Sequence, residues 1–322
     1  MRLEAMAKIA LLVAALVSSA GAVAQGGMPD RAVRIVVPFT PGGNADIVAR
    51  IVAQGMSEEL KQAVIVENRP GANAAIGAEA VARSEANGAT VLFGTAESHA
   101  LNPHLRKSLG YDPMKDFATV GIVDRFALSL VLSPRMASLA DFIAQARQNP
   151  GKLNFASWGN GSTSQIAFEQ IKQVAGLDMV HVPFQGAAPA IAAVAGGNVE
   201  AFVVPLSVAR PQAANGRVRL VAVISAAREP AAPEVPTATE LGLPVVISGW
   251  HVLAVPVATP KETLMSLNRA LNAATARADV RDRLLKAGVQ PAAATPDEAQ
   301  AMVRSEWQRW GEVARKAGIE PQ

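Results

Sequence analysis

The sequence contains no cysteine, and this absence removes several kinds of chemistry at once. Disulfide bonds, thiol catalysis, cysteine-based metal sites and a lipid anchored on a cysteine are all excluded. Histidine is also scarce: there are four, and no two of them have the H-x-x-x-H spacing of zinc hydrolases. We therefore expect neither a bound metal nor a cofactor.

Charged and aromatic residues are few and do not cluster. They make up 18% and 4% of the chain, and the formal net charge is +3 with a pI near 9.4. A nucleic-acid interface would show lysines and arginines gathered together and interleaved with aromatics, and no such patch exists. We expect no nucleic-acid partner, and the mildly basic balance suits an anionic small molecule.

Long apolar runs are missing beyond the first 24 residues, which have the form of a secretion signal. Arg2 and Lys8 precede an apolar core at 9–17, and an A-x-A sequence at 22–24 marks the expected cleavage site. The core is too short to span a bilayer. We expect cleavage before Gln25, a periplasmic location, and a mature chain of about 298 of the 322 residues, which suits two α/β lobes.

The stretch at 33–54, VRIVVPFTPGGNADIVARIVAQ, predicts a strand, a glycine-rich loop and a helix. The run 33–37 is apolar and β-branched, two prolines and two glycines interrupt it, and helical spacing begins at Asn44. Gly42 and Gly43 allow a ligand to approach the backbone closely. The free amides and the dipole of the helix start favour an anion. A tight turn without a ligand is the alternative.

The same pattern recurs at 153–174, LNFASWGNGSTSQIAFEQIKQV. A strand at 153–157 leads into a second glycine loop, and Ser162 or Thr163 is placed to cap the helix that follows. Two such units predict two similar lobes that each offer a helix start to a shared cleft. Further strands are expected at 63–67, 90–95, 180–184, 199–204, 220–224 and 250–255, and helices at 74–82, 138–148, 187–195, 260–276, 280–287 and from 295 onward.

This alternation of strands and helices predicts a mostly parallel sheet, in which ligands bind beyond the carboxyl ends of the strands. Thr95 and Ser98 lie at such an end, although ordinary turn capping explains them equally well. The apolar residues at 117–132, on either side of Asp124 and Arg125, are expected to cross between the lobes.

Several segments, in the same order along nearly the whole chain, resemble the Bug-type extracytoplasmic solute receptors, the binding proteins of the tripartite tricarboxylate transporter family. Besides 33–54, they are VIVENRPGANAAIGAEAVA (64–82), GTAESHALNPHL (94–105), YDPMKDFATVGIV (111–123), PGKLNFASWGNGSTS (150–164), HVPFQGAAPAIAAVAGGNVE (181–200), GRVRLVAV (216–223) and VPTATELGLP (235–244).

The resemblance implies an α/β fold of the type II periplasmic binding proteins, with two doubly wound lobes and a cleft between them. Lobe 1 would comprise 25–125 and 250–322, and lobe 2 would comprise 126–249. The protein would be a monomer that captures a small carboxylate or related metabolite by hinge closure, for uptake by a membrane permease or for sensing. The first loop would hold one carboxylate, partly through waters.

The candidate ligand-binding residues are those that the resemblance implies, together with those at the carboxyl ends of strands. They are Phe39, Thr40, Gly42, Gly43, Asn44, Asp46, Thr95, Ser98, Ser157, Asn160, Gly161, Ser162, Thr163 and Pro205. Asp46 has an alternative role as a structural acid in the first helical turn.

The chain departs from the family pattern at Gln165, where a histidine is common, and at Gln185, where a lysine is common. Pro205 follows Val204 where amino-acid-binding relatives often carry an aspartate. An acid there could pair with a ligand amine, so its absence favours an acid without an amine.

Catalytic signatures are poor, since no nucleophile elbow, S-x-x-K motif or phosphate-binding P-loop is present. A periplasmic enzyme that acts on an organic acid, using Asp46 or His99, is the alternative to a receptor. For His99 itself, a structural role competes with contact to an anion.

Overall fold

A single path of eight strands runs through the computed structural model, which describes the backbone of residues 31–316 and the side chains up to residue 312. The expected signal segment lies outside the described residues. The strand order is β2-β1-β3-β9-β4-β7-β5-β6, with β8 and β10 each paired to β4. The strands are β1 (Val33–Val37), β2 (Val64–Asn68), β3 (Thr90–Thr95), β4 (Phe117–Leu132), β5 (Asn154–Ser157), β6 (Val180–Pro183), β7 (Ala201–Pro205), β8 (Arg219–Val223), β9 (Ser248–Pro256) and β10 (Val289–Pro291).

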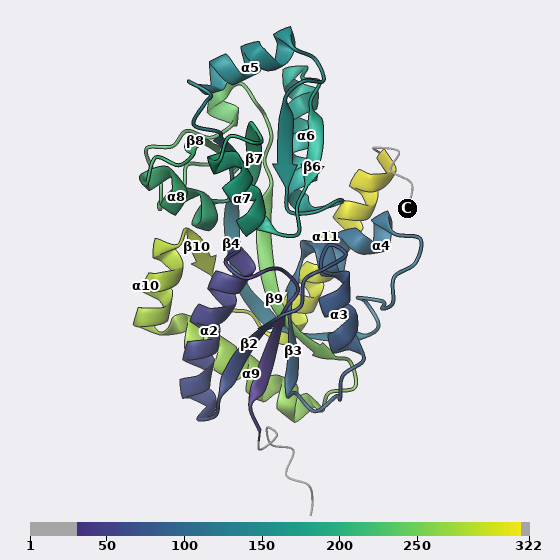
Figure 1. The fold of residues 1–322 in the computed structure, drawn as a ribbon. Coiled ribbons are helices and arrows are strands. Elements are labelled where there is room, and N and C mark those ends of the chain that lie inside the picture. Colours follow the sequence, from purple (N-terminus) through teal and green to yellow (C-terminus); the bar gives the residue numbers. More distant parts are fainter. Residues whose placement is uncertain (1–30, 317–322) are drawn as a thin grey trace, which may run out of the picture.

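The molecule has a lower and an upper half in the view of Figure 1, and β4 belongs to both. Up to Ala127, β4 pairs antiparallel with β9; from Leu128 onward it pairs with β7 and β8. The lower half holds β1, β2, β3, β9 and β10, and the upper half holds β5 to β8. The residues at 117–132 therefore form one continuous strand of 16 residues that passes between the halves.

Parallel pairing is confined to the two ends of this path. β1 lies parallel to β2 and β3, and β5 lies parallel to β6 and β7, as the two strand–loop–helix units predict. The central strands β9 and β4 run antiparallel to their neighbours. The helices are α2 (Asn44–Leu60), α3 (Ala75–Ala82), α4 (Asn102–Leu105), α5 (Leu139–Gln148), α6 (Thr163–Ala175), α7 (Ala187–Ala195), α8 (Leu206–Ala214), α9 (Lys261–Ala276), α10 (Ala278–Lys286) and α11 (Pro296–Lys316), with a π-turn at Glu97–Leu101 and a 3-10 turn at Thr239–Leu241.

Each half has its own hydrophobic core. In the upper half, Phe155 stacks on Phe168 with ring centroids 4.2 Å apart. In the lower half, Ile35 of β1 packs in one cluster with residues of α2, β3, β9 and α9. A third cluster, which includes the buried Trp310 of α11, packs α11 against β9. The lobe boundaries expected near residues 125 and 250 stay a prediction, since they fall inside or beside strands that cross between the halves.

Five short elements were not predicted: the π-turn at Glu97–Leu101, α4, α8, the 3-10 turn at Thr239–Leu241 and β10. Helix α8 contains Pro211, which lacks the amide that a helix interior uses, so its sequence does not favour a helix. The start of α11 follows prediction: Thr295 Oγ1 accepts from the Glu298 amide at 3.3 Å, and the Glu298 carboxylate accepts from the Thr295 amide at 2.8 Å.

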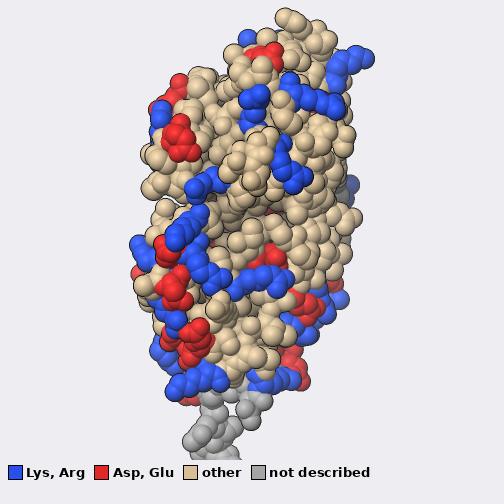
Figure 2. Space-filling view, turned by 60° about the vertical axis from the view of Figure 1, so that its left-hand side comes forward, with Lys and Arg blue, Asp and Glu red and all other residues tan. Residues whose placement is uncertain are grey.

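Acidic and basic side chains alternate over the lower half on the face shown in Figure 2. Within residues 31–316, no helix is both long enough and apolar enough to cross a membrane.

Candidate ligand-binding cleft

The first glycine loop presents the open start of α2. Gly42 adopts φ +82°, a left-handed conformation that favours glycine, and Gly43 is the N-cap residue without a side-chain cap. The Asp46 carboxylate accepts from the Gly42 amide and from Asn68 Nδ2, each at 3.0 Å, and it pairs with Arg50. Asp46 therefore braces the loop from inside, while the first amides of the helix are left without helical acceptors.

The pKa of Asp46 reflects this bracing. Burial by itself would raise the pKa, but the hydrogen bonds from Arg50, Gly42 and Asn68 outweigh burial and hold it below the usual value. The carboxylate is thus charged and committed to the loop.

Two side chains beside the α2 start have hydrogen-bonding atoms without a partner. Asn44 is 4% exposed; its Oδ1 accepts from Ser207 Oγ of α8 at 2.6 Å, whereas its Nδ2 has no partner in the described part of the chain. Thr40 Oγ1 is buried and has no partner among the same residues. A buried donor without an acceptor is costly, so these atoms call for a ligand or water.

The start of α6, at the second glycine loop, is filled from within the protein. Ser162 caps the helix by accepting from the Gln165 amide at 3.3 Å, which resolves the choice between Ser162 and Thr163. Gln165, at the position where the chain departs from the family pattern, accepts from the Gly161 amide at 2.8 Å. The remaining anion position is occupied by the carboxylate of Glu97.

Glu97 reaches this position from the lower half, directly after β3. Its Oε1 accepts from the Thr163 amide at 3.1 Å, from Thr163 Oγ1 at 2.8 Å and from Trp158 Nε1 at 3.1 Å. Its Oε2 accepts from Thr95 Oγ1 at 2.8 Å. Glu97 is 4% exposed, so this charge is stabilised by hydrogen bonds rather than by bulk water.

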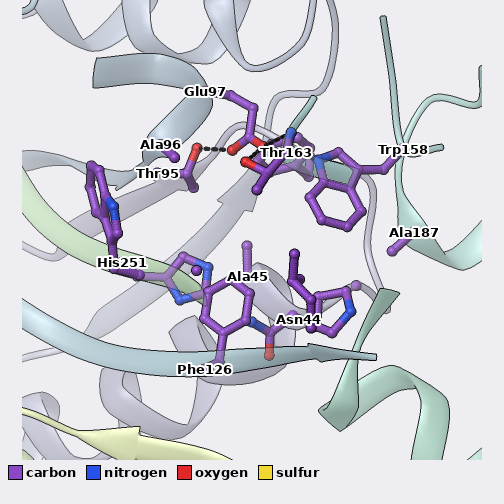
Figure 3. Close-up of a pocket in the computed structure, with 16 residues that line it drawn as sticks. Asn44, Ala45, Thr95, Ala96, Glu97, Phe126, Trp158, Thr163, Ala187 and His251 are labelled. Carbon is purple, nitrogen blue, oxygen red and sulfur yellow. Dashed lines mark hydrogen bonds between the residues drawn. The ribbon is translucent and has the colours of Figure 1, made fainter. Parts of the chain in front are cut away.

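The α2 start and Glu97 face one cleft between the two halves, and its walls are largely apolar (Figure 3). The space between its atoms, including the part open to solvent, is about 520 Å³. The cleft is lined by Phe39, Gly43, Asn44, Ala45, Thr95, Ala96, Glu97, Phe126, Leu128, Trp158, Thr163, Ala187, Pro205, Gly249, Trp250 and His251.

One wall of the cleft carries a buried histidine–aspartate pair. His251 Nδ1 lies 2.8 Å from Asp124 Oδ2, and the Asp124 side chain is fully buried. The His251 ring stacks on Phe126, with centroids 4.7 Å apart and an angle of 24° between the planes. β9 carries His251 between Thr95 of β3 and Asp124 of β4, which fixes the ring beside the cleft.

Six of the residues predicted from the sequence line this cleft: Phe39, Gly43, Asn44, Thr95, Thr163 and Pro205. Asn160 lies instead in a neighbouring hollow with Asn73, Arg106 and Gln185. Gly42, Asp46, Gly161 and Ser162 shape the two glycine loops, and Thr40 of the first loop is half-buried, with its Oγ1 atom away from solvent.

Ser98 and Ser157 are engaged within the protein. Ser98 Oγ accepts from the Thr95 amide at 2.9 Å, which is the turn-capping role, and Ser157 Oγ lies 2.6 Å from His181 Nε2. His99 is fully buried, 2.8 Å from Ser98 Oγ, and does not line the cleft. Burial lowers the pKa of His99 to about 4, against a smaller opposing contribution from a backbone hydrogen bond to Thr95.

Sequence reasoning missed Glu97, Phe126, Trp158 and His251 as cleft residues. Glu97 follows the same strand end that pointed to Thr95 and Ser98, and Trp158 follows the strand end at Ser157, so the strand-end rule could have found both. Phe126 and His251 lie within strands, where the sequence carries no signal that separates cleft-facing from core-facing side chains.

The sequence of this chain is similar to those of known proteins. The family model described as "Tripartite tricarboxylate transporter family receptor" matches residues 48–319. Protein BugT of Bordetella pertussis is 32% identical over 294 residues, which are 90% of either chain.

Solved structures agree in fold and in sequence. The periplasmic binding protein BugD superposes with a TM-score of 0.87 at 30% identity, over 91% of this chain and all of that one. A protein of R. palustris solved with adipate gives a TM-score of 0.88 at 34% identity, over 91% of this chain and 99% of that one. MatC of Rhodopseudomonas palustris, solved with bound malate, gives a TM-score of 0.83 at 32% identity, over 88% of this chain and 99% of that one. The α/β fold and the resemblance expected from the sequence are confirmed, and the chain belongs to the receptor family of the tripartite tricarboxylate transporters.

Proposed function

We propose that this protein is a periplasmic receptor that binds a small organic acid in the cleft and holds the acid's carboxylate at the start of α2. The observation that carries the proposal is the set of donors gathered there without acceptors. The first amides of a 17-residue helix have no helical acceptors, and Asn44 Nδ2 at the same helix start is buried and unpartnered among the described residues. Such a set suits an anion.

The energetics of this arrangement are sufficient for a receptor. Each hydrogen bond to a charged group contributes roughly 1.5–3 kcal/mol, and a helix terminus adds about 0.3–2 kcal/mol. Three or four such contacts total roughly 5–14 kcal/mol, a range that includes the roughly 8 kcal/mol of micromolar binding. Two relatives above 30% identity are described with acids, adipate and malate, which supports the same class of ligand for this chain.

The cleft is built from both halves, so ligand capture would be coupled to closure. Asn44 and Glu97 of the lower half bond to Ser207 and Thr163 of the upper half, and β4 and β9 form the connection about which the halves would turn. The closed monomer would deliver its ligand to the permease subunits of a tripartite tricarboxylate transporter or report it to a sensor. Small-angle X-ray scattering should show a smaller radius of gyration at saturation.

The protein would bind without turnover and without a cofactor. Asp46, one candidate catalytic group, is saturated by Gly42, Arg50 and Asn68. His99, the other, is fully buried away from the cleft. A turnover assay on each acid that binds should return it unchanged, and formation of a product would establish the enzyme alternative instead.

The decisive variant is Asn44→Asp. It keeps the oxygen that accepts from Ser207 but replaces the free Nδ2 donor by a second carboxylate oxygen, which repels an acid. Mature protein, refolded to remove bound ligand, is screened by thermal shift and titration against mono-, di- and tricarboxylates, aromatic acids and amino acids. We expect one acid class to bind and Asn44→Asp to weaken it at least tenfold.

The matched control is Asn215→Asp, because Asn215 is exposed at the end of α8 and does not line the cleft. It should bind as the wild type does. Equal affinities for wild type and Asn44→Asp would contradict the placement of the carboxylate, and no binding across the panel would contradict acid recognition itself.

A further inference from the structure

Glu97 places a negative charge where the fold would otherwise offer a second anion site. Both glycine loops lead into a helix, but only the α2 start is open, because the α6 start already bonds to the Glu97 carboxylate. All the contacts of Oε1, to the Thr163 amide, Thr163 Oγ1 and Trp158 Nε1, cross from the lower to the upper half.

Several hydrogen bonds together hold the Glu97 carboxylate in one position. The side chain is 4% exposed, and four hydrogen bonds of 2.8–3.1 Å hold its two oxygens. Leaving this position would expose a buried amide, a hydroxyl and an indole N–H at once, each of which needs a partner. In the closed cleft, Glu97 is therefore a fixed part of the wall.

The charge of a second ligand carboxylate would need a positive partner in the cleft. None of the described residues that line it is a lysine or arginine, and the single histidine, His251, already shares its Nδ1 with Asp124. The remaining walls are mainly apolar, with Phe39, Phe126 and Trp250 among them. A dicarboxylate bound at α2 would carry its second charge toward Glu97 through a region of low dielectric constant, where like charges repel strongly.

We propose that Glu97 acts as a built-in carboxylate that fills the anion position at α6, so that the cleft selects acids with one carboxylate and an apolar body and rejects dicarboxylates. This inference rests on the proposed function, since it assumes that the ligand's carboxylate lies at α2. It makes Glu97 a residue that determines specificity.

The test compares acids that differ only in the second carboxylate. Wild-type protein is titrated calorimetrically with the monocarboxylates from butyrate to octanoate, benzoate and 4-hydroxybenzoate, and with the dicarboxylates of the same carbon numbers and terephthalate. We expect at least one monocarboxylate to bind at least tenfold more tightly than its dicarboxylate partner. This comparison needs no variant, so it does not depend on whether a substitution folds.

Two variants then assign the selectivity to Glu97. Glu97→Gln removes the charge but keeps the shape, and Glu97→Ala also frees the α6 amide. We expect both variants to lower the ratio of monocarboxylate affinity to dicarboxylate affinity. Glu97→Ala should also bind a dicarboxylate at least tenfold more tightly than the wild type does. Glu85→Ala, at an exposed glutamate that bonds to Arg31, is the control and should keep the wild-type preference.

The outcomes separate the two proposals. If the wild type binds dicarboxylates as tightly as their partners, or if both Glu97 variants keep the wild-type preference, the role of Glu97 is overturned while acid binding stands. If the wild type binds no acid of either kind, acid recognition and the role of Glu97 fall together.

Discussion

The carboxylate of Glu97 accepts a hydrogen bond from the backbone amide of Thr163 at 3.1 Å, although the two residues belong to different halves and lie 66 positions apart. The same oxygen accepts from Trp158 Nε1. A single side chain of the lower half thus satisfies the helix start and the indole of the upper half. Glu97 thus brings a carboxylate to the cleft and supplies one set of the bonds that join the halves.

This contact predicts coupling between Glu97 and Trp158. Trp158→Phe removes the indole donor but keeps an aromatic ring, and it should lower the free energy of unfolding by about 1–3 kcal/mol, because a buried charge loses a partner. In a double-mutant cycle with Glu97→Gln, the change in unfolding free energy of the double variant should differ from the sum of the two single changes by roughly 0.5–3 kcal/mol.

The matched control for that cycle is Trp307→Phe, since the described contact of Trp307 with His104 uses its carbonyl and ring and not its indole N–H. Its effect should add to that of Glu97→Gln within about 0.5 kcal/mol. Additivity in the Trp158 cycle, measured by urea denaturation, would show that the indole does not stabilise Glu97.

A substitution at Gly249 should close part of the cleft. Gly249 pairs with Phe126 across β9 and β4, and a Cβ at this position would overlap the Phe126 ring. Gly249→Ala should push the ring toward the cleft and weaken acid binding at least tenfold. Titration calorimetry measures this loss. Gly196→Ala, where the added Cβ would meet no atom closer than 3.4 Å, should leave affinity unchanged and stability within about 0.5 kcal/mol.

Removal of the Asp46 charge should loosen the first glycine loop. Asp46→Asn leaves the Gly42 amide and Arg50 poorly paired, so the free energy of unfolding at pH 7 should fall by about 1.5–3 kcal/mol, and acid affinity should fall with it. Asp279→Asn, at an exposed aspartate paired with Arg277, should have a smaller effect on stability and none on affinity.

The stability difference between wild type and Asp46→Asn should change with pH in a definite direction. Because the pKa of Asp46 is held below its usual value, the folded state favours the charged form, and its contribution is complete above the ordinary aspartate pKa of about 3.9. The stability difference between wild type and Asp46→Asn should shrink as the pH falls below about 4. A difference that grows on acidification would contradict the bracing role.

His99 should make the protein less stable in acid. Its pKa is about 4 in the folded state because of burial, whereas an unfolded histidine titrates near 6.5, so the unfolded state binds the proton first. Stability from this residue is complete above pH 6.5 and falls as the pH drops toward 4, by at most about 3 kcal/mol. His99→Gln, which cannot titrate, should make the free energy of unfolding depend less steeply on pH over this range. An unchanged dependence on pH would contradict the neutral buried state.

Much of the fold could be predicted because its signals are local. The strands at 33–37 and 90–95 and the helix at 187–195 lie at the predicted residues, since apolar runs, glycine loops and helical spacing act within one segment. Helix α8 and β10 were missed for the same reason: Pro211 opposes a helix locally, and three residues of β10 carry too little pattern.

The cleft could be predicted only in part, because its chemistry depends on contacts between distant segments. Asn44 and Thr163 were found from the loops that precede their helices. That the α6 start is filled by Glu97, however, depends on a contact across 66 residues. The position of His251 beside Phe126 likewise depends on the register of β9 against β4, which no local pattern specifies.

The central claim is that an acid's carboxylate binds at α2 while Glu97 keeps α6 occupied. The most direct measurement follows the backbone amides by NMR as the tightest-binding acid is titrated. We expect the amide protons of residues 43–46 to shift strongly downfield at saturation, to an extent that depends on the acid, and the Thr163 amide to reach the same position with every acid, because its acceptor in the closed cleft is Glu97 and not the ligand. A large shift at Thr163 with little change at residues 43–46 would contradict the account.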